Sequence, residues 1–160
     1  MAGSKSVTVS RVIPASRDDL WRVLNDTRRY AEWVPQTLEV THSDGEGVVG
    51  ATYHERNRVF GPIKGDSRWR VVEADERHSL HEGEGLPLVD NVSIEFELQP
   101  AGESTEVTLT LRYDTTLGPL GALIDKAAHA QTVASQGKAL ANLEALVRAE
   151  AAAPEGQAER

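Results

Sequence analysis

The sequence predicts an α+β protein in which a curved antiparallel sheet of about seven strands wraps around one long C-terminal helix. Residues 92–98 and 107–113 alternate between apolar and polar side chains, as strands do when one face of an antiparallel sheet is buried. A final segment, from about Pro119 to Ala153, has no further proline before Pro154 and is long enough to cross a small domain. We therefore expect one helix to lie across the sheet.

Length and composition favour a single domain over residues 6–153 and a disordered tail over 154–160. No apolar run approaches the ~20 residues of a membrane span, and the first residues lack a signal-peptide core. The chain has no cysteine, which excludes disulfides and thiolate catalysis and suits a reducing compartment. Its net charge of -8 disfavours nucleic acid as a partner. We expect a cytoplasmic protein without a membrane span.

The N-terminal part predicts one strand followed by two short helices. Residues 7–13 are largely β-branched and end at a proline, which is typical of a strand. Ser16 is a candidate N-cap, because two aspartates fall in the next turn and apolar residues follow at helical spacing over 20–24. Tyr30, Trp33 and Val34 indicate a second short helix, closed by Pro35.

Residues 36–115 predict a succession of short strands, because turn signals rich in glycine, proline and aspartate recur along them. Besides the two alternating segments, strands are expected at about 51–59 and 67–72. Residues 100–104 predict a hairpin between the last two strands.

The order of elements and four segments, 14–24, 30–35, 69–75 and 105–109, resemble the polyketide cyclase/dehydrase and lipid-transport family of the START/Bet v 1-like (SRPBCC) superfamily. The resemblance extends from about residue 6 to 150. It implies a helix-grip fold, with a cavity between the sheet and the long helix. It leaves the ligand open, because one fold supports many functions.

The residues agree with such a cavity, because the first half of the helix is built mostly from small or polar side chains and cannot fill an aromatic cup. We expect several hundred Å3 of space, as in typical small-molecule sites. The predicted lining consists of Trp33, Tyr53, Glu55, Asn57, Trp69, Phe96, Leu98, Leu109, Leu111, Tyr113, Ile124, His129 and Val133.

Two orientations remain open in the sequence. Counting back from the leucines at 140 and 143 places Gln136, Val133, His129 and Asp125 on the inward face of the helix, but 120, 123, 124 and 127 define another face. Both can point inward only if the helix bends, and Gly137 is one position for a bend. In the strand at 51–59 we favour an inward face of Tyr53, Glu55 and Asn57, because the alternative buries three potentially charged groups.

Sequence motifs for metal or covalent catalysis are absent. The five histidines do not share a metal-ligand spacing, and neither HExxH nor GxSxG occurs. We predict no metal and no cofactor. If the protein is an enzyme, the acid/base candidates are His129, Glu55 and Tyr113.

Three functions follow as hypotheses. The favoured one is binding of a small hydrophobic or aromatic molecule, lipid- or polyketide-like, by a monomer or weak homodimer. The first alternative is a polyketide cyclase, aromatase or dehydratase that uses acid/base groups of the pocket. The second alternative is a protein-interaction or stress-related module.

Overall fold

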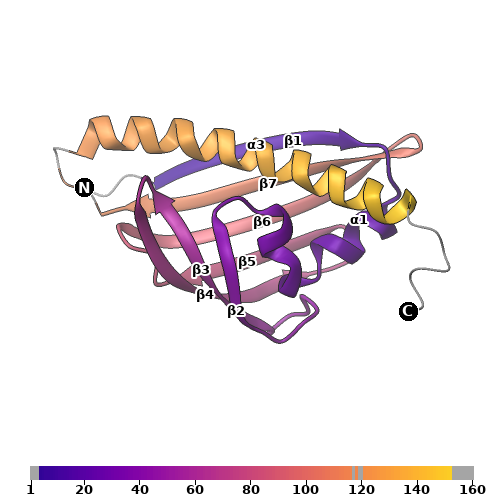
Figure 1. Ribbon diagram of the computed structural model, residues 1–160, viewed down its shortest axis with the longest axis horizontal. Helices are drawn as coiled ribbons and strands as arrows, with labels where there is room; N and C mark the ends of the chain where they lie inside the picture. The colour runs from indigo at the N-terminus through magenta and orange to yellow at the C-terminus, as the bar shows by residue number, and fades with distance from the viewer. Residues whose placement is uncertain (1–3, 117, 119–120, 153–160) are drawn as a thin grey trace.

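The computed structural model describes residues 4–116, 118 and 121–152, and shows a seven-stranded antiparallel sheet that curves around one long helix (Figure 1). The predicted α+β fold is confirmed. Its elements in chain order are β1 (Ser4–Ile13), α1 (Arg17–Leu24), a 3-10 turn (Thr27–Arg29), α2 (Tyr30–Trp33), β2 (Thr37–Ser43), β3 (Thr52–Phe60), β4 (Ile63–Ala74), β5 (His78–Glu84), β6 (Val89–Ala101), β7 (Ser104–Thr115) and α3 (Ala122–Ala152).

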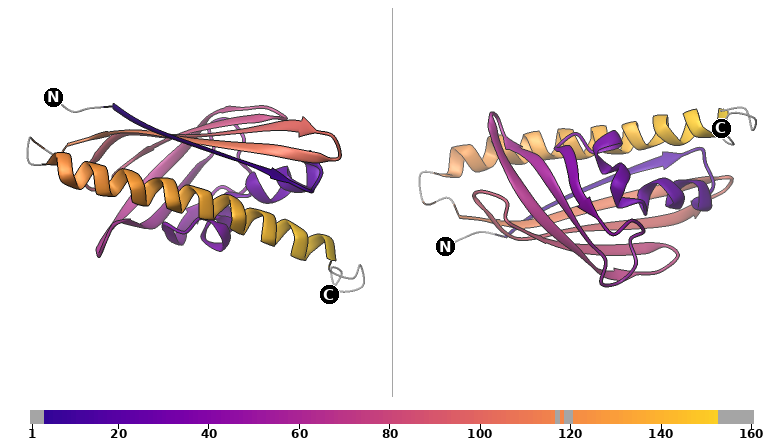
Figure 2. Two further views of the ribbon diagram at one scale, coloured as in Figure 1. Left: turned by 90° about the horizontal axis from the view of Figure 1, so that it is seen from above. Right: turned by 60° about the horizontal axis from the view of Figure 1, so that its bottom comes forward.

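The strands lie in the order β1-β7-β6-β5-β4-β3-β2, so every neighbour along the chain from β2 to β7 is joined by a hairpin and β1 closes the far edge. The predicted hairpin turns at Gly102, whose positive φ of 66° suits a residue without a side chain. Helix α3 crosses the concave side and contacts β1, β7, α1 and α2 (Figure 2).

The two short helices cover one end of the sheet. The side chain of Ser16 accepts a hydrogen bond from the backbone N–H of Asp19 at 3.1 Å, which confirms the predicted N-cap of α1. Leu20, Val23 and Leu24 of α1 are buried against the sheet. The backbone carbonyl of Trp33 accepts a hydrogen bond from Asn142 Nδ2 at 3.1 Å, which ties α2 to α3.

Helix α3 is continuous through Gly137, so the bend considered above does not interrupt it. Its buried positions in the second half are Ala139, Leu140, Leu143 and Val147. Residues 11 positions apart lie on the same face of a helix, because 11 residues make close to three full turns. Gln136 therefore shares the face of Val147, and Ala128 shares the face of Ala139. A straight helix therefore turns one face to the sheet along its whole length.

His129 and Val133 lie off this face, and both are exposed. The sequence prediction placed them inward because it took a step of three residues from Gln136 where the helix needs four. Each residue turns the helix by about 100°, so one position moves a side chain from the sheet to solvent. Within the expected helix, 119–120 and 153 lie outside the described residues, as does the predicted disordered tail at 154–160.

Among the described residues, no helix is long and apolar enough to cross a membrane.

Tight packing is concentrated at the end covered by α1 and α2, where the second half of α3 meets the sheet. The fully buried apolar side chains at this end include Ile13, Leu20, Val23, Leu24, Leu98, Val107, Leu109, Leu140 and Leu143.

Candidate functional site

A cavity of about 170 Å3 lies between the inner face of the sheet and the first half of α3. Helix α3 contributes only small or polar side chains and Ile124 to its wall, while the sheet contributes mostly aromatic and aliphatic side chains, together with polar ones such as Glu55 and Asn57. The residues that line the cavity include Tyr30, Gln36, Thr37, Tyr53, Glu55, Asn57, Trp69, Val92, Ile94, Phe96, Leu111, Tyr113, Ile124, Asp125, Ala128, Thr132 and Gln136.

Most residues selected from the sheet lie around this cavity. Tyr53, Glu55 and Asn57 are buried, whereas Arg56 and Arg58 of the same strand are exposed, so the predicted inward face of β3 is confirmed. The predicted residues found in the lining are Tyr53, Glu55, Asn57, Trp69, Phe96, Leu111, Tyr113 and Ile124.

The other five predicted lining residues lie elsewhere. Trp33, Leu98 and Leu109 belong to the packed core, because α1, α2 and the second half of α3 fill that end of the cup. His129 and Val133 point away from the sheet, for the helical reason given above. His129 is therefore not placed to exchange a proton with a molecule in the cavity.

The cavity is smaller than the several hundred Å3 expected, because aromatic side chains occupy much of the cup. The rings of Tyr53 and Trp69 are nearly parallel, with an angle of 5° and centroids 6.1 Å apart. Tyr30 meets Tyr53 edge to face at 5.2 Å. These contacts build a nearly continuous aromatic wall on one side of the cavity.

Trp69 lies directly over Gly83, its pairing partner on β5. A Cβ atom at Gly83 would come within 2.7 Å of two carbon atoms of the indole, closer than van der Waals contact allows. The indole N–H donates to Ser67 Oγ at 2.8 Å. The absence of a side chain at 83 therefore lets the indole lie flat against the sheet.

Glu55 is the buried acid of the cavity, with 5% of its surface exposed. Burial raises the pKa of its carboxyl group to about 7, although hydrogen bonding by Thr37 and Trp69 lowers it in part. The Thr37 hydroxyl donates to Glu55 Oε1 at 3.2 Å. Near neutral pH the group is present in both protonation states, so it is able to accept or to donate a proton.

A buried chain of three polar side chains runs behind the aromatic wall. Tyr53 Oη is 2.8 Å from His81 Nδ1, and His81 Nε2 is 2.7 Å from Ser79 Oγ. Burial lowers the pKa of His81 to about 4, so the imidazole is neutral at physiological pH. It orients the Tyr53 hydroxyl. Sequence reasoning missed His81, because Leu80, the one large apolar residue of β5, alternates with it and predicts the opposite face. Only the pairing of His81 with Ile94 of β6 shows that it points inward.

Four residues of the cavity wall carry a buried polar atom without a hydrogen-bond partner among the described residues. The atoms are Tyr30 Oη, Gln36 Oε1, Asp125 Oδ1 and Gln136 Oε1. A buried group of this kind keeps its desolvation cost unless another molecule supplies a partner. The site therefore combines an apolar body with a few unpaired polar groups.

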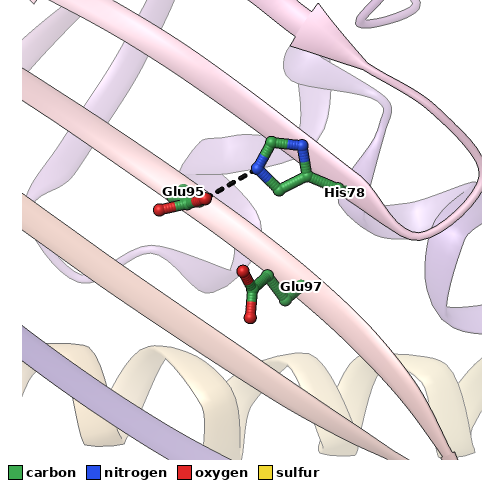
Figure 3. A group of neighbouring side chains, drawn as sticks. All are labelled: His78, Glu95 and Glu97. Atoms are coloured by element: carbon green, nitrogen blue, oxygen red, sulfur yellow. Dashed lines mark hydrogen bonds and ion pairs between the residues drawn. The ribbon is translucent and has the colours of Figure 1, made fainter.

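His78, Glu95 and Glu97 form a separate group on the outer face of the sheet, with ligand-type atoms within 4.8 Å of one another (Figure 3). His78 Nε2 lies 2.7 Å from Glu95 Oε1, and Arg112 donates to Glu95 Oε2 at 2.8 Å. The Arg112 hydrogen bond lowers the pKa of Glu95. Because a guanidinium already holds this carboxylate, the group has the character of a surface ion-pair network.

The fold and the cavity define a helix-grip protein of the START/Bet v 1-like superfamily. The sequence model of the polyketide cyclase / dehydrase and lipid transport family matches residues 4–148, and the chain belongs to that family. The resemblance inferred from the sequence is thus confirmed. No curated protein matches the chain significantly.

Solved structures with low sequence identity share the fold over nearly the whole chain. The protein TTHA0849 from Thermus thermophilus is 24% identical, with a TM-score of 0.74, and the match covers 93% of this chain and 100% of that one. The Zhui aromatase/cyclase from Streptomyces sp. R1128 is 20% identical (TM-score 0.72; 94% and 98% covered). Norcoclaurine synthase from Thalictrum flavum is 17% identical (TM-score 0.65; 91% and 87% covered).

Proposed function

We propose that this protein binds a small hydrophobic or aromatic molecule of one or two rings in the cavity between the sheet and the first half of α3. The observation that carries the proposal is the apolar cavity of about 170 Å3, with polar atoms in its wall that lack partners. An apolar cavity of about 150 Å3 engineered into another protein binds benzene, so this volume suits a ligand of that scale.

The comparisons support a ligand of this size without identifying it. The family description includes both cyclase or dehydrase activity and lipid transport. The norcoclaurine synthase structure holds dopamine and hydroxybenzaldehyde, two single-ring aromatic molecules, in the same fold. A long acyl chain would need more space than this cavity offers in the conformation described.

A cavity-filling substitution tests the proposal. Ala128→Phe places a ring in the cavity from α3, and the exposed Ala134→Phe makes the same change on the other side of the helix. We expect one- and two-ring aromatic molecules to bind the wild type and Ala134→Phe in calorimetric titrations, and binding to Ala128→Phe to fall at least about 100-fold. Equal binding to both variants, or no binding to the wild type across the panel, would refute it.

A second candidate function is acid/base catalysis of the cyclase or dehydratase type, and the observation that favours it is Glu55, whose pKa is raised to about 7 inside the cavity. Tyr113 lines the same cavity and is the second candidate for proton transfer. Glu55→Gln keeps the shape of the side chain, so it should leave ligand binding intact while abolishing any turnover of a polyketide-like substrate. Turnover that survives this substitution would exclude Glu55 as the acid/base group.

A further inference from the structure

Two of the unpaired polar side chains lie at the buried end of the cavity. Gln136 is 5% exposed and Tyr30 is 3% exposed, and neither Gln136 Oε1 nor Tyr30 Oη has a hydrogen-bond partner among the described residues. The next buried residues along α3 after Gln136, Ala139 and Leu140, are ordinary apolar core residues. An apolar residue in place of Gln136 or Tyr30 would avoid the cost of an unpaired polar group.

The other two unpaired atoms belong to Gln36 and Asp125, which are only partly buried, whereas Tyr30 and Gln136 are fully buried. Asp125 precedes Gln136 by three turns of α3, about 16 Å along the helix axis. It follows Ile124, which is 44% exposed, so it marks the open end of the cavity. A single-ring molecule does not span this distance, so Gln136 and Tyr30 remain as the fully buried residues of the lining that carry an unpaired polar atom.

The chemistry of these two groups selects a class of partner. A tyrosine hydroxyl donates one hydrogen bond and accepts others, while an amide offers an acceptor oxygen and, if turned about its last torsion, a donor nitrogen. An ammonium group only donates, and an ether or ketone oxygen only accepts. A hydroxyl does both, so it satisfies Gln136 Oε1 as a donor and Tyr30 Oη as an acceptor.

Resting on the proposed function, we propose that Tyr30 and Gln136 bind a hydroxyl group of the ligand and thereby select a phenol-type molecule over a hydrocarbon of the same shape. In this arrangement the side chains of Tyr53, Trp69 and Phe96 contact the ring of the ligand, and the two polar residues bind its hydroxyl substituent. Selection of this kind is strong, because a site built around a hydroxyl leaves its own polar groups unpaired when the analogue lacks one.

The pair p-cresol and p-xylene tests the proposal, because the two differ only by a hydroxyl in place of a methyl group. Affinities are measured by calorimetric titration for the wild type, Tyr30→Phe, Gln136→Leu and the double variant. Gln131→Leu is the matched control, since it makes the same change on the same helix outside the cavity lining. Melting temperatures of the unligated proteins report folding, and none should fall for variants that remove an unpaired buried atom.

We expect the wild type and Gln131→Leu to bind p-cresol at least about 10-fold more tightly than p-xylene. Each single variant should reduce this ratio, and the double variant should prefer p-xylene, because water solvates the hydroxyl better than an apolar wall does.

The proposal is overturned if the wild type binds p-xylene as tightly as p-cresol, or if the double variant keeps the wild-type ratio; ligand binding itself then still stands. If the wild type binds no aromatic molecule of the panel, the proposed function fails, and this inference fails with it.

Discussion

The two halves of α3 present one continuous face to the sheet but meet it in different ways. In the anchored half, residues 137–152, Leu140, Leu143 and Val147 are buried against the sheet and α1. In the hollow half, residues 122–136, Ala128 and Thr132 occupy the same face and leave a cavity. The contrast shows that small side chains on one stretch of an unbroken helix leave a cavity, while larger side chains further along the same face pack against the sheet.

The largest expected effect distinguishes the two halves by stability. Leu143→Ala removes a fully buried side chain from the anchored half and should lower the free energy of unfolding by about 2–5 kcal/mol. Ile124→Ala in the hollow half should cost about 1 kcal/mol or less, because that side chain is 44% exposed and already borders empty space. Urea unfolding measures both changes, and comparable costs would contradict the division of α3 into two halves.

The pH dependence of stability sharpens the comparison, because the cavity region holds a buried acid and a buried base. Glu55 has a pKa of about 7 in the folded state, against 4.5 ordinarily. The free energy of unfolding therefore falls by about 3 kcal/mol as the pH rises through this interval, because the folded protein keeps a proton that the unfolded chain has lost. His81 has a folded pKa of about 4 against 6.5 ordinarily. Its contribution has the opposite sign, since the unfolded chain takes up a proton that the folded one lacks, and stability rises with pH by a similar amount.

Between pH 4.5 and 6.5 these two contributions largely cancel in the wild type. Glu55→Gln should therefore show stability that increases with pH across this range, and His81→Gln should show stability that decreases. Denaturant unfolding at closely spaced pH values measures the slopes. Parallel curves for the wild type and both variants would show that neither group titrates as its burial predicts.

A smaller effect is expected from adding volume at equivalent positions. Ala139→Phe overfills the anchored half, where Ala139 has no exposed surface, and should cost about 1–3 kcal/mol. Ala128→Phe lies 11 residues earlier on the same face and enters the cavity, so its cost should be near zero. Thermal unfolding of the two variants makes the comparison directly, and equal losses would mean that the cavity is closed to a ring.

The sequence predicted the fold and the strand faces better than the helix face, for a geometric reason. In a strand, side chains alternate between two faces, so only one face had to be chosen as the inward one. The face of Tyr53, Glu55 and Asn57 was predicted correctly, because the opposite choice would have buried three potentially charged groups. In α3 an error of one residue rotates a side chain by about 100°, and the small residues around His129 gave no pattern to correct it.

Contacts between segments that are distant in the chain could not be predicted from the sequence. The chain from Tyr53 through His81 to Ser79 depends on strands β3 and β5 curving toward each other around β4. The unpaired atom of Tyr30 depends on how α2 meets the sheet. Neither arrangement has a local signature, whereas hydrophobic alternation and helix capping do.

Gly83 has a consequence for how such a protein changes over evolutionary time. It belongs to the strand behind Trp69, not to the cavity lining, yet any side chain there would displace the indole that forms part of the wall. A single mutation at this position would alter the shape of the cavity while every lining residue kept its identity. Ligand preference in a lineage of such proteins is thus able to drift through a position that a comparison of cavity residues alone would overlook.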